Sequence, residues 1–190
     1  MTLALSSRMD CVAQSDIRRM TIECTRIGGI NLAQGVCDTE TPAIVRKGAR
    51  EAIDAGVNTY TRYDGLAELR RAIALKQERF TGIPVDPEGE VIVSAGATGA
   101  FYAACMALLN PGDECILFEP FYGYHVSTLK AVQAVPAWVR TSPPDWSFSR
   151  ADLDRVKTTR TKAIMVNTPA NPSGKVFTRE ELEWIAAFAI

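Results

Sequence analysis

The stretch EVIVSAGATGAFYAACMALLNPGDECILFEPFYGY (90–124) decides the fold class of this chain. Its first residues, EVIVS (90–94), are mostly apolar and β-branched, which predicts a buried strand. A glycine-rich turn (95–98) and an apolar helix (99–109) follow, and the breaker NPGD separates this helix from a second strand (114–118). A strand, a helix and a strand in this order predict a βαβ unit with parallel strands.

The residues after this unit continue the alternation. AVQAVPAWVR (131–140) predicts another strand, SRADLDRVKT (149–158) a helix and KAIMV (162–166) a further strand. TREELEWIAAFA (178–189) predicts a helix, because its apolar residues recur at helical spacing. The sequence therefore predicts an α/β fold with a mainly parallel sheet and flanking helices.

The residues before the unit predict helices and an N-terminal arm. SDIRRMTIECTRIGG (15–29) fits a short helix that ends at its glycines, and INLAQG (30–35) fits a short strand or an extended arm. PAIVRKGAREAIDAG (42–56) fits an amphipathic helix with proline at its start. GLAELRRAIALKQERFTG (65–82) fits a second helix. We therefore expect an arm that leads into the α/β part.

Composition excludes several function classes. The 190 residues are 47% hydrophobic and 23% charged, as in ordinary globular proteins. A net charge of −1 provides no basic surface for nucleic acid or an anionic membrane. No apolar stretch reaches the roughly 20 residues of a membrane span, and the N-terminus is a poor secretory signal. The 5 cysteines include no C-x-x-C pair, which argues against a metal site and suits the cytoplasm.

Ligands of parallel α/β sheets gather at the carboxyl ends of the strands, where connections precede helix N-termini. SAGATGA (94–100) is the first such connection. Its small residues let backbone N–H groups approach an anion, the next helix adds its positive end, and Thr98 adds a hydroxyl. It is neither a Walker P-loop nor a G-x-G-x-x-G fingerprint. It predicts either a phosphate cradle or a tight turn that needs small residues for packing.

A second connection, EPFYGYH (119–125), carries three aromatic residues and the only histidine just after a strand. A planar side chain at a strand end can stack on a flat ligand. The alternative is that Phe121, Tyr122 and Tyr124 belong to the core or to a subunit interface. His125 is more typical of a hydrogen-bonded structural residue than of a catalyst.

The third connection is NTPANPSG (167–174), between a predicted strand and a predicted helix. Pro172 fixes its own φ and biases Asn171 towards an extended backbone, and Gly174 lets the chain turn away. The side chain of Asn171 is therefore aimed, and its amide can donate to an oxygen of a ligand. The alternative is an Asx-turn that caps the next helix.

In this order and spacing, the segments resemble the N-terminal half of the fold-type-I, class I and II aminotransferases that depend on pyridoxal phosphate (PLP). The branch includes aspartate, aromatic and kynurenine aminotransferases. The segments are NLAQGVCDTETP, NTYTRYDGLAELRRAI, residues 91–125 and VNTPANPSGKVFTREEL. The resemblance implies that residues 1–41 form an N-terminal arm with a small-domain segment. Residues 42–190 would form an incomplete large PLP-binding domain.

The resemblance also implies roles for individual residues. Ala97 and Thr98 match the loop that binds the cofactor phosphate, and Tyr122 matches the aromatic residue that stacks on the pyridine ring. Asn171 matches the asparagine that donates to the phenolic oxygen of PLP. Tyr60 matches a tyrosine that reaches the cofactor phosphate of a neighbouring subunit.

For the substrates, the resemblance implies an amino acid and a keto acid, with Gly35 near the substrate carboxylate. It also implies a homodimer. The family needs a Schiff-base lysine, an aspartate at the pyridinium nitrogen and an arginine for the substrate carboxylate. In the family all three follow the NPSG segment, beyond position 190. We therefore assign no catalytic residue, and we expect the 190-residue chain to be an inactive fragment by itself.

Two other functions fit the same segments. A PLP-dependent lyase, decarboxylase or synthase shares the cofactor loops, so this part of the sequence barely discriminates among them. A non-catalytic truncated product, which binds a phosphorylated ligand or assembles with a separate C-terminal half, is the alternative from another class.

Overall fold

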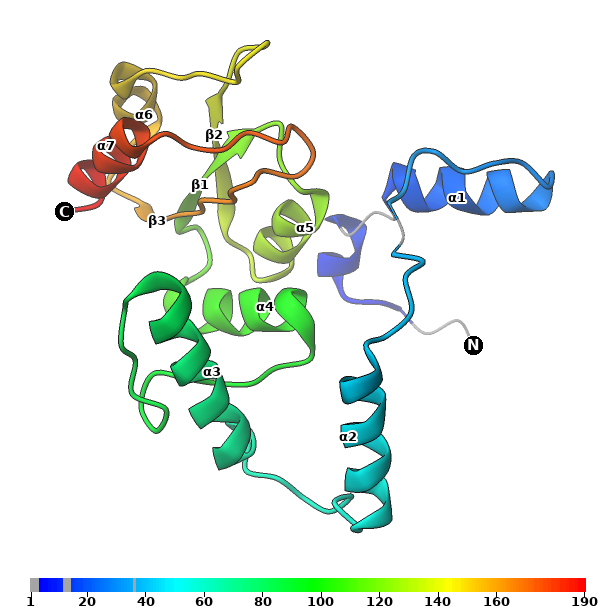
Figure 1. Cartoon of the computed structure of the whole chain (residues 1–190). Coiled ribbons are helices and arrows are strands. Elements are labelled where there is room, and N and C mark those ends of the chain that lie inside the picture. The colour runs from blue at the N-terminus through cyan, green and yellow to red at the C-terminus, as the bar shows by residue number, and fades with distance from the viewer. Residues whose placement is uncertain (1–3, 12–14, 36) are drawn as a thin grey trace. The chain divides into compact units, whose positions relative to one another are not determined.

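The computed structural model describes residues 4–11, 15–35 and 37–190 (Figure 1). The chain forms two compact units: the described part of Met1–Ser15 joins Gly96–Ile190 in the first, and Asp16–Ala95 is the second. The first unit contains η1 (Ser7–Cys11), α4 (Gly96–Leu108), β1 (Glu114–Glu119), α5 (Gly123–Ala131), β2 (Val135–Arg140), α6 (Arg150–Val156), β3 (Thr161–Ile164) and α7 (Arg179–Ala189). The second contains α1 (Asp16–Arg26), α2 (Ala43–Asp54) and α3 (Ala67–Thr81).

The first unit is built on a three-stranded sheet with the order β2-β1-β3. β1 pairs in parallel with both neighbours, so that Ile116 lies opposite Ala137 on β2 and Ile164 on β3. Helices α5 and α6 connect the strands in the sequence. This arrangement confirms the predicted α/β fold with a parallel sheet.

Side chains of β1 alternate between two apolar cores. Cys115 and Leu117 face a core to which α4 and α5 contribute Cys105 and Leu129. Ile116 belongs to a second core, which also contains Leu153 of α6 and Ile185 of α7. Because successive residues of a strand point to opposite faces, the sheet is covered by a helical layer on each side.

At the amino end of β1, the buried carboxylate of Glu114 ties β1 to the turn before β3. Its Oε1 accepts a bond from Arg160 Nη2 (2.8 Å), and its Oε2 accepts bonds from Thr158 Oγ1 (2.6 Å) and Thr161 Oγ1 (3.2 Å). The bond from Thr158, followed by those from Arg160 and Thr161, holds the pKa of Glu114 below its usual value, although burial acts the other way.

In the second unit, a buried ion-pair network fixes the connection before α3. Arg70 is fully buried and lies 3.3 Å from the carboxylate of Asp64 and 3.1 Å from that of Glu88. Val93 N–H donates to the Asp64 carbonyl (3.0 Å), and Gly65 has φ +99° beside Val93. A Cβ at position 65 would lie 2.6 Å from Val93 Cγ2, so only glycine fits there.

Some of the predicted elements are wrong. Residues 90–94 form no strand, because Val93 N–H bonds to Asp64 and these residues join no ladder among the described parts of the chain. Residues 30–35 also form no strand, which leaves the extended arm as the remaining prediction for them. Helix α4 begins at Gly96, so most of the predicted turn (95–98) is its first helical turn. Helix α5 was not predicted, and its residues, GYHVSTLKA, show little amphipathic pattern.

Replacement of Glu114 by Gln should lower the free energy of unfolding by about 1–3 kcal/mol at pH 7, because buried donors lose a charged acceptor. The pKa of Glu114 is depressed in the folded protein. Its stabilisation is therefore present above the unfolded pKa and is lost as the pH falls through the folded pKa. Urea unfolding at pH 7 and pH 3 should show a smaller difference between the two proteins at pH 3.

Glu78→Gln, on an exposed position of α3, is the matched control. It should change stability by less than about 0.5 kcal/mol. Equal stability of Glu114→Gln and the unaltered protein at pH 7 would contradict the role given to this carboxylate.

Candidate functional site

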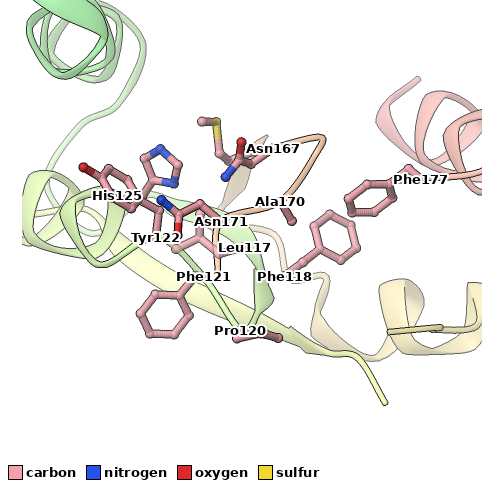
Figure 2. A pocket seen from close by; sticks show the side chains of 11 residues that line it. Leu117, Phe118, Pro120, Phe121, Tyr122, His125, Asn167, Ala170, Asn171 and Phe177 are labelled. Carbon is pink, nitrogen blue, oxygen red and sulfur yellow. The ribbon is translucent and has the colours of Figure 1, made fainter. Parts of the chain in front are cut away.

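A pocket lies at the carboxyl end of β1, where the start of α5 meets the connection from β3 to α7 (Figure 2). Figure 2 shows Tyr122, His125 and Asn171 gathered on one side of it, and Phe118 and Phe177 on the other. It is lined by Leu117, Phe118, Pro120, Phe121, Tyr122, His125, Met165, Asn167, Ala170, Asn171 and Phe177. One side of the pocket therefore carries polar groups beside an aromatic ring, and the other side is apolar.

Tyr122 stands at the N-cap position of α5 with an extended backbone (φ −76°, ψ 118°). Its carbonyl accepts a bond from the N–H of His125 (3.0 Å), which begins the helix. The Tyr122 ring is half-buried and lies 5.1 Å from the Tyr124 ring and 5.3 Å from the His125 ring, measured between centroids. These contacts restrict the ring while one part of it borders the pocket.

His125 connects this side of the pocket to α4. Its ring lies 5.0 Å from that of Phe101 in an edge-to-face arrangement. Burial lowers the pKa of His125 below its usual value, so the imidazole is neutral at pH 7. Thr98 lies three residues before Phe101, and residues at this spacing share one side of a helix. Helix α4, whose first turn carries Thr98, therefore contacts the His125 side of the pocket through Phe101.

That first turn offers backbone donors. Ala97 and Thr98 are exposed, and Gly96 begins α4 with φ +73° and open space around its Cα. The first N–H groups of a helix have no partner within the helix, and the helix dipole makes this end positive. An anion is thus the kind of group that this turn can bind.

The connection from β3 to α7 contributes two amide side chains, Asn167 and Asn171. The turn is closed by backbone bonds from Ala170 N–H to the Lys175 carbonyl (2.8 Å) and from Gly174 N–H to the Ala170 carbonyl (2.7 Å). Among the residues that the structure describes, neither side-chain amide donates to the protein. Both are therefore available to an oxygen of a ligand.

Of the predicted residues, Tyr122 and Asn171 meet in this pocket, and Ala97 and Thr98 lie on the helix that contacts its His125. Tyr60 and Gly35 belong to the second unit and are exposed there, Tyr60 completely. Asn167 also lines the pocket and was not predicted. Its position as the first polar residue after a predicted strand could have indicated it.

Three features are absent from the described residues. No group of histidine, cysteine, aspartate or glutamate side chains in these parts could hold a metal ion. None of their helices is both long and apolar enough to cross a membrane. Lysine is absent from the residues that line the pocket in the described chain.

Comparison with known proteins gives a consistent result. The family of aminotransferases of class I and II matches residues 27–189. A probable N-succinyldiaminopimelate aminotransferase of Mycobacterium tuberculosis is 40% identical over 186 residues, which are 97% of this chain and 47% of that protein. An aspartate aminotransferase of Pyrococcus abyssi is 34% identical over 99% of this chain and 49% of its own length. The chain thus spans about half the length of these relatives.

Solved structures agree with this comparison. The N-succinyldiaminopimelate aminotransferase structure from M. tuberculosis matches with a TM-score of 0.93 and 39% identity, over 98% of this chain and 49% of that one. A protein from Escherichia coli, described as having a methionine aminotransferase function, matches with a TM-score of 0.91 and 28% identity, over 98% and 49% of the two chains.

His125 is the only histidine of the chain, so its NMR signal is unambiguous. Because burial lowers its pKa, the ring protons should titrate with a midpoint below the usual value of about 6.5. The unfolded chain then binds more protons than the folded one, so the protein should lose stability as the pH falls below about 6.5. His125→Gln should lack both the signal and this loss, and a midpoint above 6.5 would contradict the burial of the ring.

Proposed function

The chain belongs to the class I and II aminotransferases, and we propose on this premise that it binds PLP and forms the cofactor site of an aminotransferase. The whole protein then transfers an amino group from an α-amino acid to an α-keto acid. One observation carries the proposal: Tyr122 and Asn171, which lie on separate connections in the sequence, line the same pocket.

The chemistry of the donors fits the cofactor. PLP presents a phosphate, a flat ring and a phenolic oxygen. The first turn of α4 offers the backbone N–H groups of Ala97 and Thr98 with the Thr98 hydroxyl, and Tyr122 offers an aromatic face. Asn167 and Asn171 offer amide donors that the described protein does not use. These groups are of the kinds that could bind the three parts of PLP.

In this proposal each residue has a binding or orienting role. The positive end of α4 would hold the phosphate. Tyr122 would bind the flat ring by stacking and keep water from it, and the side-chain amide of Asn171 would donate to the phenolic oxygen and favour its ionised form. When bound, PLP supplies the electron sink for chemistry at the amino acid.

We assign the second unit to subunit contact and substrate binding. Tyr60 would reach the cofactor phosphate of a second copy, and Gly35 would lie near the substrate carboxylate. The exposed apolar side chains of α2, with Ile44 at 80% and Ile53 at 72% exposure, support a homodimer that covers them. Residues 1–41 are then an arm with a small-domain segment, and residues 42–190 part of the large domain.

The cofactor implies no particular amino acid. The relatives' names give three amino donors to compare on the whole protein, namely N-succinyldiaminopimelate, kynurenine and aspartate. The cysteines whose side chains the structure describes, Cys24, Cys37, Cys105 and Cys115, are free thiols. Free thiols support a reducing compartment, and we propose the cytoplasm.

Binding of PLP to the 190-residue chain tests the proposal directly, by equilibrium dialysis with absorbance detection. Asn171→Ala should weaken binding about tenfold, since a hydrogen bond to a charged oxygen contributes roughly 1.5–3 kcal/mol. The matched control is Asn110→Ala. Asn110 also precedes a proline, is exposed, and lies in the turn before β1, at the opposite end of this strand from the pocket.

Asn110→Ala should bind PLP like the unaltered chain. Tyr122→Leu should weaken binding, whereas Tyr122→Phe should retain most of it, because stacking needs the ring and not the hydroxyl. A folded chain without measurable affinity for PLP, or equal effects of Asn171→Ala and Asn110→Ala, would contradict the proposed site.

A further inference from the structure

Lys175 lies on the same connection as Asn171, between β3 and α7, and its ammonium group contacts other parts of the protein. Its side chain is 8% exposed, and Nζ donates to Glu181 Oε1 (2.7 Å) on α7. Nζ also donates to the carbonyl of Asp145 (3.3 Å) and lies 5.8 Å from the centroid of the Phe177 ring. One side chain thus joins the connection to α7 and to the segment before α6.

Glu181 uses both of its carboxylate oxygens. While Oε1 binds Lys175, Oε2 accepts a bond from the N–H of Thr178 (2.7 Å), and Thr178 Oγ1 accepts one from the N–H of Glu181 (3.2 Å). This capping box begins α7. Because Glu181 is buried, its charge depends on Lys175 for compensation, and the two side chains hold each other in one geometry.

The backbone transmits this constraint to Asn171. The carbonyl of Lys175 accepts a bond from Ala170 N–H (2.8 Å), and the N–H of Lys175 donates to Ser173 Oγ (3.3 Å). Asn171 lies between these two bonded positions. A displacement of Lys175 would therefore move both sides of the turn whose tip presents the Asn171 amide, although Lys175 itself does not line the pocket.

We propose that Lys175 is a positioning residue for Asn171, and that it acts through its buried ion pair with Glu181. The role in cofactor binding rests on the proposed function, whereas the ordering of the turn does not. The same contacts give Lys175 a structural partner for its ammonium group, which separates it from a lysine that would bind the cofactor covalently.

The test compares four variants of the 190-residue chain. Lys175→Met removes the ion pair, Lys175→Arg keeps the charge, and Lys175→Met/Glu181→Leu removes both charges so that no buried carboxylate is left unpaired. Arg179→Met is the matched control, because Arg179 forms an exposed ion pair with Glu183 on the same helix (2.9 Å). Thermal unfolding, amide hydrogen exchange at Gly174 and PLP affinity are measured for each.

Gly174 is the reporter of the turn, since its N–H bonds to the Ala170 carbonyl (2.7 Å). Lys175→Met should speed its exchange about tenfold or more and weaken PLP binding, and Lys175→Arg should restore much of both. The double variant should regain thermal stability relative to Lys175→Met but keep fast exchange and weak binding. Arg179→Met should resemble the unaltered chain in all three measurements.

A double variant with unaltered Gly174 exchange and PLP affinity would overturn the proposal, because the ion pair would then contribute only stability. If the unaltered chain fails to bind PLP, the proposed function fails, but the exchange measurement still decides whether Lys175 orders the turn. Unchanged hydrogen exchange at Gly174 in a folded Lys175→Met variant would also overturn the proposal that Lys175 positions Asn171.

Discussion

The burial of β1 between two helical layers is the constraint on which the first unit depends. Its residues alternate between the core of α4 and α5 and the core of α6 and α7, so β1 must be apolar on both faces and paired on both edges. This central position brings the end of β1, the start of α5 and the connection after β3 to one edge of the sheet. The pocket with Tyr122 and Asn171 is a consequence of that topology.

Sequence periodicity predicted β1 and α7 closely. Strand β1 was predicted one residue short, and α7 and its N-terminal Thr178 follow the expected capping pattern. The predicted strand at 90–94 failed for a physical reason: strand formation needs a neighbouring strand, and Val93 bonds to the backbone of Asp64 instead. Helix α5 was missed because GYHVSTLKA lacks an apolar stripe at helical spacing: it contributes mainly Leu129 and Val126 to one core.

The candidate site was predictable to the extent that its chemistry lies in short segments. Tyr122 and Asn171 were candidates because each follows a predicted strand, and Pro172 restricts the backbone of Asn171. The residues alone left other roles open for both, and the family resemblance decided between them. Asn167 follows a predicted strand and could have been chosen on the same ground. The contact of His125 with Phe101 could not, since it depends on how α4 and α5 meet. The ion pair of Lys175 with Glu181 likewise joins two residues whose burial the sequence does not reveal.

The pocket combines side chains of connections with walls supplied by β1. Leu117 and Phe118 belong to the strand and to the two cores, whereas Tyr122, His125 and Asn171 stand outside the strands. Substitutions in the connections can therefore change what the site recognises without changing how the sheet packs. New ligand preferences can therefore evolve by replacement of a few residues at one edge of the sheet. The buried strand is meanwhile selected for packing and stability.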